Sequence, residues 1–313
     1  MIDGALPYLR CPVCEQALSR IDRVLRCAAG HGFDLAKQGY ANLSNGRVPY
    51  PGDTPEMVTD RESFLAAGHY AFIADALASY ASSGRPASCA NNGRPASRAN
   101  NGRPASRANN DGPASRADND GPASWANNDG LVVDAGTGTG YYLARVLEGN
   151  RACTGLGLDV SKAALRRAAR AHPRGSAVLT DLWRPLPIRD ESAALVLDVF
   201  APRNGPEFHR VLRPDGVLLV VTPAADHLIE LIEAYGLIHV DPDKATRVAE
   251  SLGRHFTPLE SRVLRHRLEL TAAEVRTLIG MTPNAHHVPA DIRPEAASTV
   301  TAAVTVTAYR KAV

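Results

Sequence analysis

The segment LVVDAGTGTG, residues 131–140, has residue types and a spacing suited to binding a nucleotide-like ligand. Its apolar beginning predicts a buried parallel strand with Asp134 near its end, and the apolar residues after the turn predict a helix. Glycine permits tight backbone dihedrals and close approach to a ligand. Strand, glycine turn and helix together form the ligand pocket at the carboxyl ends of the strands in open α/β sheets. The alternating glycines are Gly136, Gly138 and Gly140.

The D-x-G-x-G-x-G spacing of this turn narrows the class of ligand. Dinucleotide folds use G-x-G-x-x-G and P-loops use G-x-x-x-x-G-K-[ST], whereas no lysine follows here. The spacing resembles the first motif of the class I S-adenosylmethionine methyltransferases. Residues 153–159 predict a second strand that ends in Asp159, about 20 residues past the glycines, where such folds hold ribose hydroxyls. A glycine turn that binds no ligand is the alternative.

Four metal-binding side chains are clustered near the start of the chain. Cys11 and Cys14 form a Cys-x2-Cys pair, and after twelve further residues Cys27 and His31 complete the set. Three sulfurs and one imidazole make a closed tetrahedral Zn²⁺ site, which is structural because catalytic zinc keeps an open position. Such a small module buries little core, so the metal supplies folding energy. Unrelated cysteines are the alternative, and contact of the module with RNA is a separate question.

Composition limits the class of protein. The 313 residues are 44% apolar and include five cysteines, and the cluster near the start favours a metal site in a reducing compartment over disulfides. No run of about 18 apolar residues is present, and the first residues lack a signal-peptide pattern. We therefore expect a cytoplasmic protein without a membrane span. The net charge of +2 gives no general case for nucleic-acid binding.

Residues 84–129 form a nine-residue repeat rich in Gly, Pro, Ser and Asn. With almost nothing apolar, the segment cannot offset its ordering entropy, so we expect a disordered insert. It carries six Arg and four Asp, which leaves the rest of the chain balanced at 29 basic and 29 acidic residues. The expected organisation is a zinc-ribbon-like module at 1–45, a helical linker region at 46–83, this insert, and a methyltransferase domain at 130–313.

The elements that must position the glycine turn alternate regularly. In the tail, residues 254–313, two closing strands are expected on either side of a helix at 271–280. The alternation predicts an α/β fold with a Rossmann-like, mostly parallel seven-stranded sheet. Thr54, Pro55 and Glu56 predict the start of an earlier helix. Strands are expected at 131–135, 153–158, 176–180, 193–200 and 216–222, and helices at 140–148, 161–171, 204–212 and 226–236.

The chain resembles the RlmA-type 23S rRNA (guanine-N1)-methyltransferases over everything outside the insert. Residues 199–204, VFAPRN, are most similar to the TlrB-like branch of that family, which is linked to resistance to tylosin-type macrolides. The other similar marks are the Cys/His set, the glycine turn, and residues 33–43, 67–70, 157–162, 222–223, 227–228 and 281–283.

The resemblance implies S-adenosyl-L-methionine as cofactor and one structural Zn²⁺ on Cys11, Cys14, Cys27 and His31. Gly138 and Thr139 would lie against the methionine part and Asp159 would take the ribose. Asp181 has the usual position for contact with the adenine amino group, and an N-terminal cap for the next turn is its alternative. The expected cofactor residues are Tyr70, Asp134, Gly136, Gly138, Thr139, Gly140, Asp159, Asp181 and His227.

Methylation of guanine N1 requires loss of the N1 proton or stabilisation of the anion that it leaves. Asp198 is the candidate proton acceptor, and a buried carboxylate paired with a neighbouring helix is an equal alternative. Arg203 is expected to stabilise negative charge on O6 or to contact a phosphate. Phe200 and Pro202 are candidates for stacking on an extruded base, and Phe200 is alternatively sheet packing.

Two other functions are open from the sequence. One is a methyltransferase for tRNA or a small molecule, since the fold alone does not exclude it. The zinc module and residues 67–70 argue against it. The other is a zinc-ribbon RNA-binding protein without catalysis, against which the intact glycine turn and Asp159 argue. The expected partner is 23S rRNA, and the resemblance also suggests a homodimer over a long rRNA hairpin.

Overall fold

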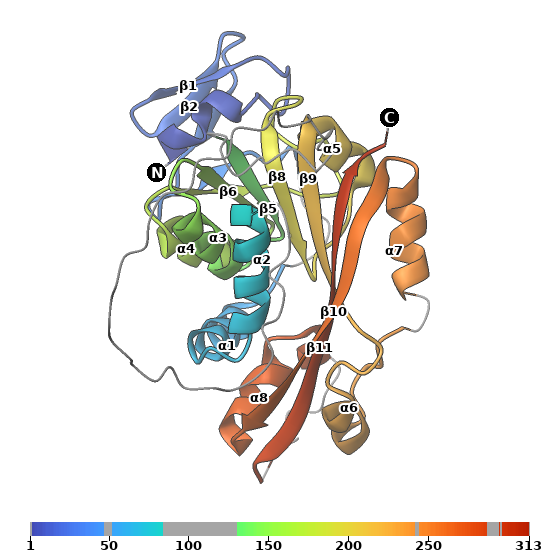
Figure 1. Cartoon of the computed structure of the whole chain (residues 1–313). Coiled ribbons are helices and arrows are strands. Elements are labelled where there is room, and N and C mark those ends of the chain that lie inside the picture. Colours follow the sequence, from blue (N-terminus) through green and yellow to red (C-terminus); the bar gives the residue numbers. More distant parts are fainter. Residues whose placement is uncertain are drawn as a thin grey trace, which may run out of the picture.

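The computed structural model describes residues 2–46, 52–83, 130–241, 244–286, 294 and 296–312. A large sheet runs through the molecule, and a small three-stranded sheet lies at one end of it (Figure 1). The predicted repeat insert falls outside the described residues. Within the described ranges, no helix has the length and apolar character needed to cross a membrane.

The main sheet has the strand order β10-β11-β9-β8-β5-β6-β7-β4. The strands from β9 to β4 pair in parallel, whereas β11 is antiparallel to both β9 and β10. The predicted α/β fold is therefore confirmed, with a two-residue edge strand added to the seven expected. The strands are β4 (Ala41–Asn42), β5 (Leu131–Ala135), β6 (Thr154–Asp159), β7 (Gly175–Leu179), β8 (Ala193–Val199), β9 (Leu212–Pro223), β10 (Phe256–Leu270) and β11 (Ser298–Lys311).

Helix starts follow the capping signals in the sequence. In α1 (Pro55–Ala66), the Thr54 hydroxyl accepts a hydrogen bond from the Met57 N–H at 3.3 Å, as the capping pattern predicted. In α8 (Ala272–Gly280), Thr271 and Glu274 form a reciprocal capping box. The other α-helices are α2 (Ala71–Ser83), α3 (Tyr141–Gly149), α4 (Lys162–Ala171), α5 (Gly205–Val211), α6 (Ile229–Tyr235) and α7 (Lys244–Gly253).

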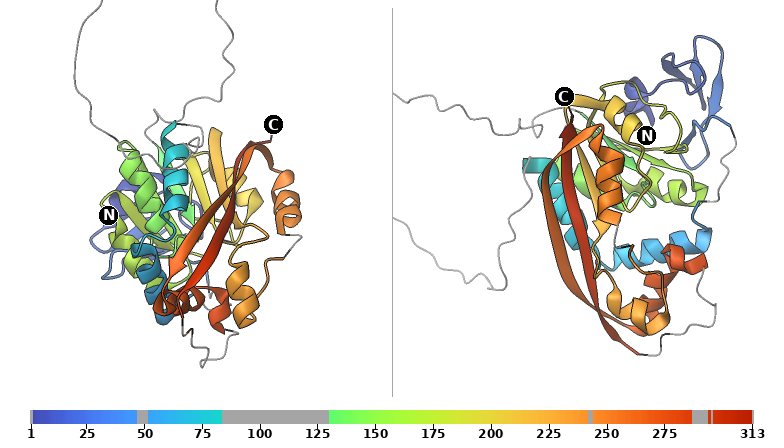
Figure 2. Two further views of the ribbon diagram at one scale, coloured as in Figure 1. Left: turned by 60° about the horizontal axis from the view of Figure 1, so that its bottom comes forward. Right: turned by 90° about the vertical axis from the view of Figure 1, so that its right-hand side faces the viewer.

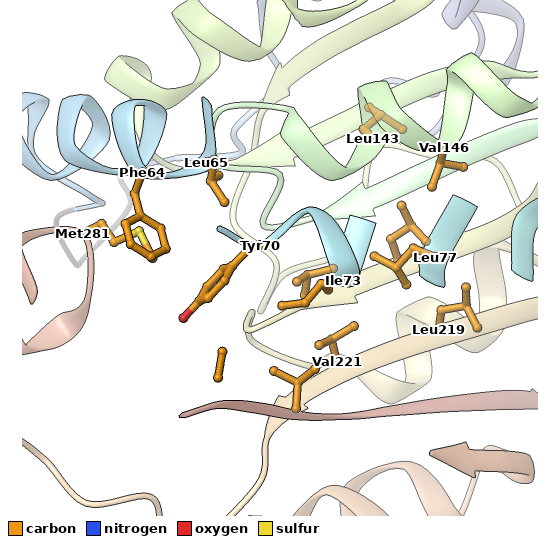
Figure 3. Close-up of a cluster of buried hydrophobic side chains, with 14 of the residues drawn as sticks. Phe64, Leu65, Tyr70, Ile73, Leu77, Leu143, Val146, Leu219, Val221 and Met281 are labelled. Carbon is orange, nitrogen blue, oxygen red and sulfur yellow. The ribbon is translucent and has the colours of Figure 1, made fainter. Parts of the chain in front are cut away.

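Apolar side chains fill both faces of the main sheet. Along β8 every residue is buried, which is typical of a parallel strand covered on both sides. Leu195 and Leu197 belong to the core under α2 and α3, whereas Val196 belongs to the core under α5 and α7. Figure 3 shows Ile73 and Leu77 of α2 packed near Leu143 and Val146 of α3. This packing fixes the start of α2, and with it Tyr70.

The zinc-ribbon segment forms its own antiparallel sheet from β1 (Leu18–Ile21), β2 (Val24–Cys27) and β3 (Gly32–Asp34). Leu9 pairs with Ile188 in an isolated bridge, and the Arg10 N–H donates to the Pro187 carbonyl at 3.0 Å. Because Ile188 precedes β8, the small sheet lies at the end where the parallel strands begin. Figure 1 shows it beyond that end, whereas α1 and α8 lie at the opposite end; Figure 2 shows the same separation from the side.

Candidate active site

A cavity of about 450 Å³ lies at the carboxyl ends of the parallel strands, and we call it the inner cavity. The glycine turn after β5, the end of β6 and the residues after β8 all contribute to its lining. Arg61 of α1 and Met281 at the end of α8 close it from the other side. Of the predicted cofactor residues, the lining includes Tyr70, Gly136, Gly138, Thr139, Asp159 and His227.

The three glycines of the turn all adopt positive φ, but for different reasons. Gly136 has φ 76°, and a Cβ there would lie 2.5 Å from the Ala201 Cβ. Its lack of a side chain therefore allows the segment after β8 to approach the turn. At Gly140, with φ 83°, a Cβ would lie 2.9 Å from atoms of α4. Gly140 is outside the lining of the inner cavity, so the packing of α3 on α4 is what requires it.

Two carboxylates hold the turn in place. Asp134 is buried outside the cavity lining, and its Oδ2 accepts a hydrogen bond from the Thr137 hydroxyl at 2.7 Å. Burial raises the pKa of Asp134 to about 7, although the Thr137 bond acts in the opposite direction. Asp159 lines the cavity and accepts hydrogen bonds from the Gly138 N–H at 2.9 Å and the Ser161 N–H at 2.8 Å. Burial also raises the pKa of Asp159, against those two bonds.

Arg61 and Asp53 also line the inner cavity, and sequence reasoning missed them both. Their side chains form an ion pair, and Arg61 Nη2 donates to the Met281 carbonyl at 2.8 Å. A Cβ on Gly138 would lie 3.5 Å from Arg61 Nη1, so the guanidinium faces the glycine turn. One sequence signal existed, because Arg61 has helical spacing with the buried Met57 and Leu65 and therefore falls on the apolar face of α1.

Tyr70, His227 and Phe200 form an aromatic group on one wall of the cavity. The Tyr70 hydroxyl lies 3.4 Å from His227 Nε2, and the Ala303 N–H donates to His227 Nδ1 at 3.1 Å. Nδ1 is therefore an acceptor, which places the proton of the neutral ring on Nε2. Phe200 has φ 56°, is 41% exposed, and its ring lies 6.1 Å from that of His227. In Figure 3 Tyr70 lies between Phe64 and Ile73.

The two predicted catalytic residues form an ion pair. Asp198 is fully buried, and its Oδ1 lies 3.6 Å from Arg203 Nη1. Among the described residues, neither carboxylate oxygen of Asp198 has a hydrogen-bond partner. Burial raises its pKa well above the ordinary range, and Arg203 acts in the opposite direction. Asp198 lines no described cavity, whereas Arg203 lines a second one.

This second cavity, which we call the outer cavity, has a volume of about 700 Å³ and adjoins the inner one. Asp181, a predicted cofactor residue, lines neither cavity. Its Oδ1 accepts a hydrogen bond from the Trp183 N–H at 3.0 Å, and its Oδ2 lies 3.5 Å from Arg184 Nε. Leu182 lines the inner cavity instead, and Trp183 lines the outer one. Four residues line both cavities: Pro202, Pro223, His227 and Thr282.

The predicted metal ligands converge away from these cavities. The ligand atoms of Cys11, Cys14, Cys27 and His31 all lie within 4.8 Å of one another. Cys14 Sγ is 3.6 Å from Cys27 Sγ, and Cys27 Sγ is 3.4 Å from His31 Nδ1. A tetrahedron with metal–sulfur bonds of about 2.3 Å has edges of about 3.8 Å. The cluster therefore fits one structural Zn²⁺.

The chain is similar to known proteins over nearly its whole length. A family model described as "RlmA, N-terminal" matches residues 9–44, and one described as "Methyltransferase domain" matches residues 132–216. A candidate 23S rRNA (guanine-N1)-methyltransferase of Micromonospora griseorubida is 50% identical, covering 97% of this chain and 98% of that protein. The 23S rRNA (guanine(748)-N1)-methyltransferase of Streptomyces fradiae is 41% identical, covering 92% and 89%. The solved structure of MccD protein is 16% identical with a TM-score of 0.39, covering 58% of this chain and 90% of that one.

Proposed function

The chain belongs to the RlmA-type family of 23S rRNA (guanine-N1)-methyltransferases, and we propose that it methylates N1 of a guanine in a domain II hairpin of 23S rRNA. The family predicted from the motifs is thereby confirmed. The observation that supports the reaction is the inner cavity, where the glycine turn meets Tyr70 and His227 at the carboxyl ends of the strands.

The lining of the inner cavity fits S-adenosylmethionine. Arg61 lies against Gly138 and forms an ion pair with Asp53, so a guanidinium and a carboxylate are at hand for the carboxylate and the ammonium of the methionine part. Asp159, held by two backbone N–H groups, has a position suited to the ribose. The cofactor supplies a methyl group on a sulfonium sulfur, which is already a good leaving group. The protein therefore needs no covalent nucleophile, and its task is placement of the base and exclusion of water.

In the proposed reaction, the bound cofactor would supply its methyl group to guanine N1, and the sulfonium sulfur would keep the electron pair of the bond to that carbon. The N1 proton would pass to solvent water. Arg203 lines the outer cavity and stabilises negative charge on O6. Asp198 lines neither cavity and holds Arg203 in position through the 3.6 Å ion pair. The role expected for Asp198 from the sequence, direct acceptance of the guanine N1 proton, stays a prediction.

The RNA partner and the setting of the reaction are parts of the same proposal. The protein acts in the cytoplasm on 23S rRNA, as a homodimer that spans a long hairpin, and the methyl group gives resistance to tylosin-type macrolides. A strain that lacks the gene should then show a lower inhibitory concentration of tylosin. An unchanged inhibitory concentration would remove the resistance role and leave the methylation untouched.

Primer extension tests the reaction directly. A methyl group on N1 blocks Watson–Crick pairing, so reverse transcriptase stops at the modified base. Comparing 23S rRNA from strains with and without the gene should show one gene-dependent stop in the domain II hairpin. In parallel, purified protein with labelled cofactor should transfer label to deproteinised 23S rRNA and not to tRNA. Label in tRNA or in small metabolites, without any stop in 23S rRNA, would replace this proposal with the alternative substrate classes.

A further inference from the structure

An exposed indole lies beside the mouth of the active site. Trp183 is the only tryptophan among the described residues, and its side chain is 60% exposed. Exposed apolar side chains that lie together mark ligand-binding grooves and interaction sites, whereas single ones scattered over a surface are ordinary. Seven such side chains are exposed in the described ranges, and three of them line the two cavities. These three are Trp183, Phe200 and Ile238.

The outer cavity adjoins the inner one at residues other than the Arg61–Asp53 ion pair, which lines the inner cavity alone. The residues common to both cavities include His227, Pro202 and Pro223, so the two cavities meet at these side chains. Arg61 and Asp53 line the inner cavity alone, whereas Trp183 and Arg203 line the outer cavity alone. An acceptor base that approaches through the outer cavity therefore meets the cofactor at a position distant from the cofactor's zwitterionic end.

The backbone that carries Trp183 is fixed. Its own N–H donates to Asp181 Oδ1 at 3.0 Å. The preceding carbonyl, that of Leu182, accepts from Asn204 Nδ2 at 2.8 Å, which ties the segment to the start of α5. Because Asn204 directly follows Arg203, the indole and the guanidinium are mounted on one hydrogen-bonded unit. A rigid aromatic surface loses little entropy when a flat ligand stacks on it.

We propose that the outer cavity receives the extruded target guanine and that Trp183 is the surface on which this base stacks. The proposal rests on the proposed function, since it names the base-binding part of the same site. An enzyme that modifies a base within folded RNA takes it out of its stack and holds it between aromatic and apolar side chains. Trp183 supplies the aromatic face, Pro202 an apolar wall, and Arg203 a donor for O6. The proline and arginine were candidates from the sequence, whereas the tryptophan was not.

Variants of Trp183 separate stacking from folding. Loss of one base–aromatic stack costs about 5- to 150-fold in binding, so Trp183→Ala should lower kcat/KM for a hairpin transcript by about that factor. Trp183→Phe should retain most of the activity, because a phenyl ring still stacks. S-adenosylhomocysteine affinity, measured by calorimetry, should be equal in all variants. Leu259→Ala is the matched control, since Leu259 is an exposed apolar residue, 41% exposed, that lines neither cavity.

Fluorescence identifies the occupant. The chain has two tryptophans, Trp125 and Trp183, so Trp125→Phe leaves Trp183 as the sole reporter. Its emission should be quenched by a hairpin with the target guanine and much less by the same hairpin with an abasic site at that position. Equal quenching by both would mean that another nucleotide stacks on Trp183 and would overturn the proposal.

The remaining outcomes are distinguishable from failure of the function itself. If wild-type protein methylates guanine N1 and Trp183→Ala does so with unchanged kcat/KM, the stacking role is wrong while the function stands. If Trp183→Ala changes the sedimentation of the free protein, the indole belongs to an interface between two copies of the chain, which also overturns the proposal. If the wild-type protein leaves 23S rRNA unmethylated, the proposed function fails before Trp183 is considered.

Discussion

Arg61 gives the sharpest prediction at the scale of single residues. A charge-assisted hydrogen bond contributes about 1.5–3 kcal/mol, so Arg61→Ala should weaken S-adenosylhomocysteine binding by about 10- to 150-fold. Methylthioadenosine lacks the amino-acid part of the cofactor, and its affinity should be unchanged. Isothermal calorimetry with both ligands measures the difference. Arg167→Ala is the control, because Arg167 also forms an ion pair on a helix but lies outside the inner cavity. An equal loss of affinity for both ligands would mean that Arg61 supports the fold and does not contact the amino-acid part of the cofactor.

Asp134 gives a prediction about pH. Burial raises the pKa of this carboxyl to about 7 in the folded chain, whereas an unfolded Asp titrates near 4. The folded state therefore binds the proton more tightly, and Asp134 lowers stability progressively as pH rises from about 4 to about 7. In Asp134→Asn the amide oxygen still accepts the Thr137 bond without titrating. The melting temperature of this variant should fall less between pH 5 and pH 7.5 than that of the wild type, and exposed Asp215→Asn should follow the wild type.

At the scale of elements, two glycine variants can separate the effect of a close approach between segments from the effect of backbone strain at positive φ. Gly136 and Gly236 both have positive φ, 76° and 62°. A Cβ at Gly136 would lie 2.5 Å from the Ala201 Cβ, whereas nothing lies within 4 Å of a Cβ at Gly236. Gly236→Ala should cost only the backbone strain, about 1 kcal/mol. Gly136→Ala should lower the melting temperature further and weaken cofactor binding in calorimetry. Equal effects of the two variants would show that φ alone matters.

Local pattern predicted the elements well because each parallel strand is a short apolar run between turn residues. The strand expected at 131–135 is β5, and the helix expected at 271–280 is α8. Register and neighbours are not local properties, so β4 was not foreseen. The same limit explains the site. Glycine spacing marks Gly138 within one turn, whereas Arg61 and Trp183 reach the cavities only after segments far apart in sequence pack together.

At the scale of the whole molecule, the zinc module and the inner cavity lie at opposite ends of the sheet. Leu9 joins the module to Ile188, before β8, and the cavity lies after the carboxyl ends. Removal of zinc should therefore unfold the module, because the metal supplies its folding energy, while the cavity keeps its lining. We expect Cys14→Ser to lose zinc, measured by atomic absorption, and to keep S-adenosylhomocysteine affinity within about threefold. Methylation of the hairpin should fall if the rRNA contacts the zinc module as well as the cavity end, because the variant then loses one of these two contacts.

The control for this experiment is Cys153→Ala. Cys153 is a buried cysteine outside the metal cluster, so its variant should keep one zinc per chain and retain methylation. If Cys14→Ser instead loses cofactor binding together with zinc, the two ends of the sheet are coupled through the edge where β4 pairs with β7. If Cys14→Ser keeps full methylation without zinc, the module acts as a folding device and the RNA is held by the cavity end alone.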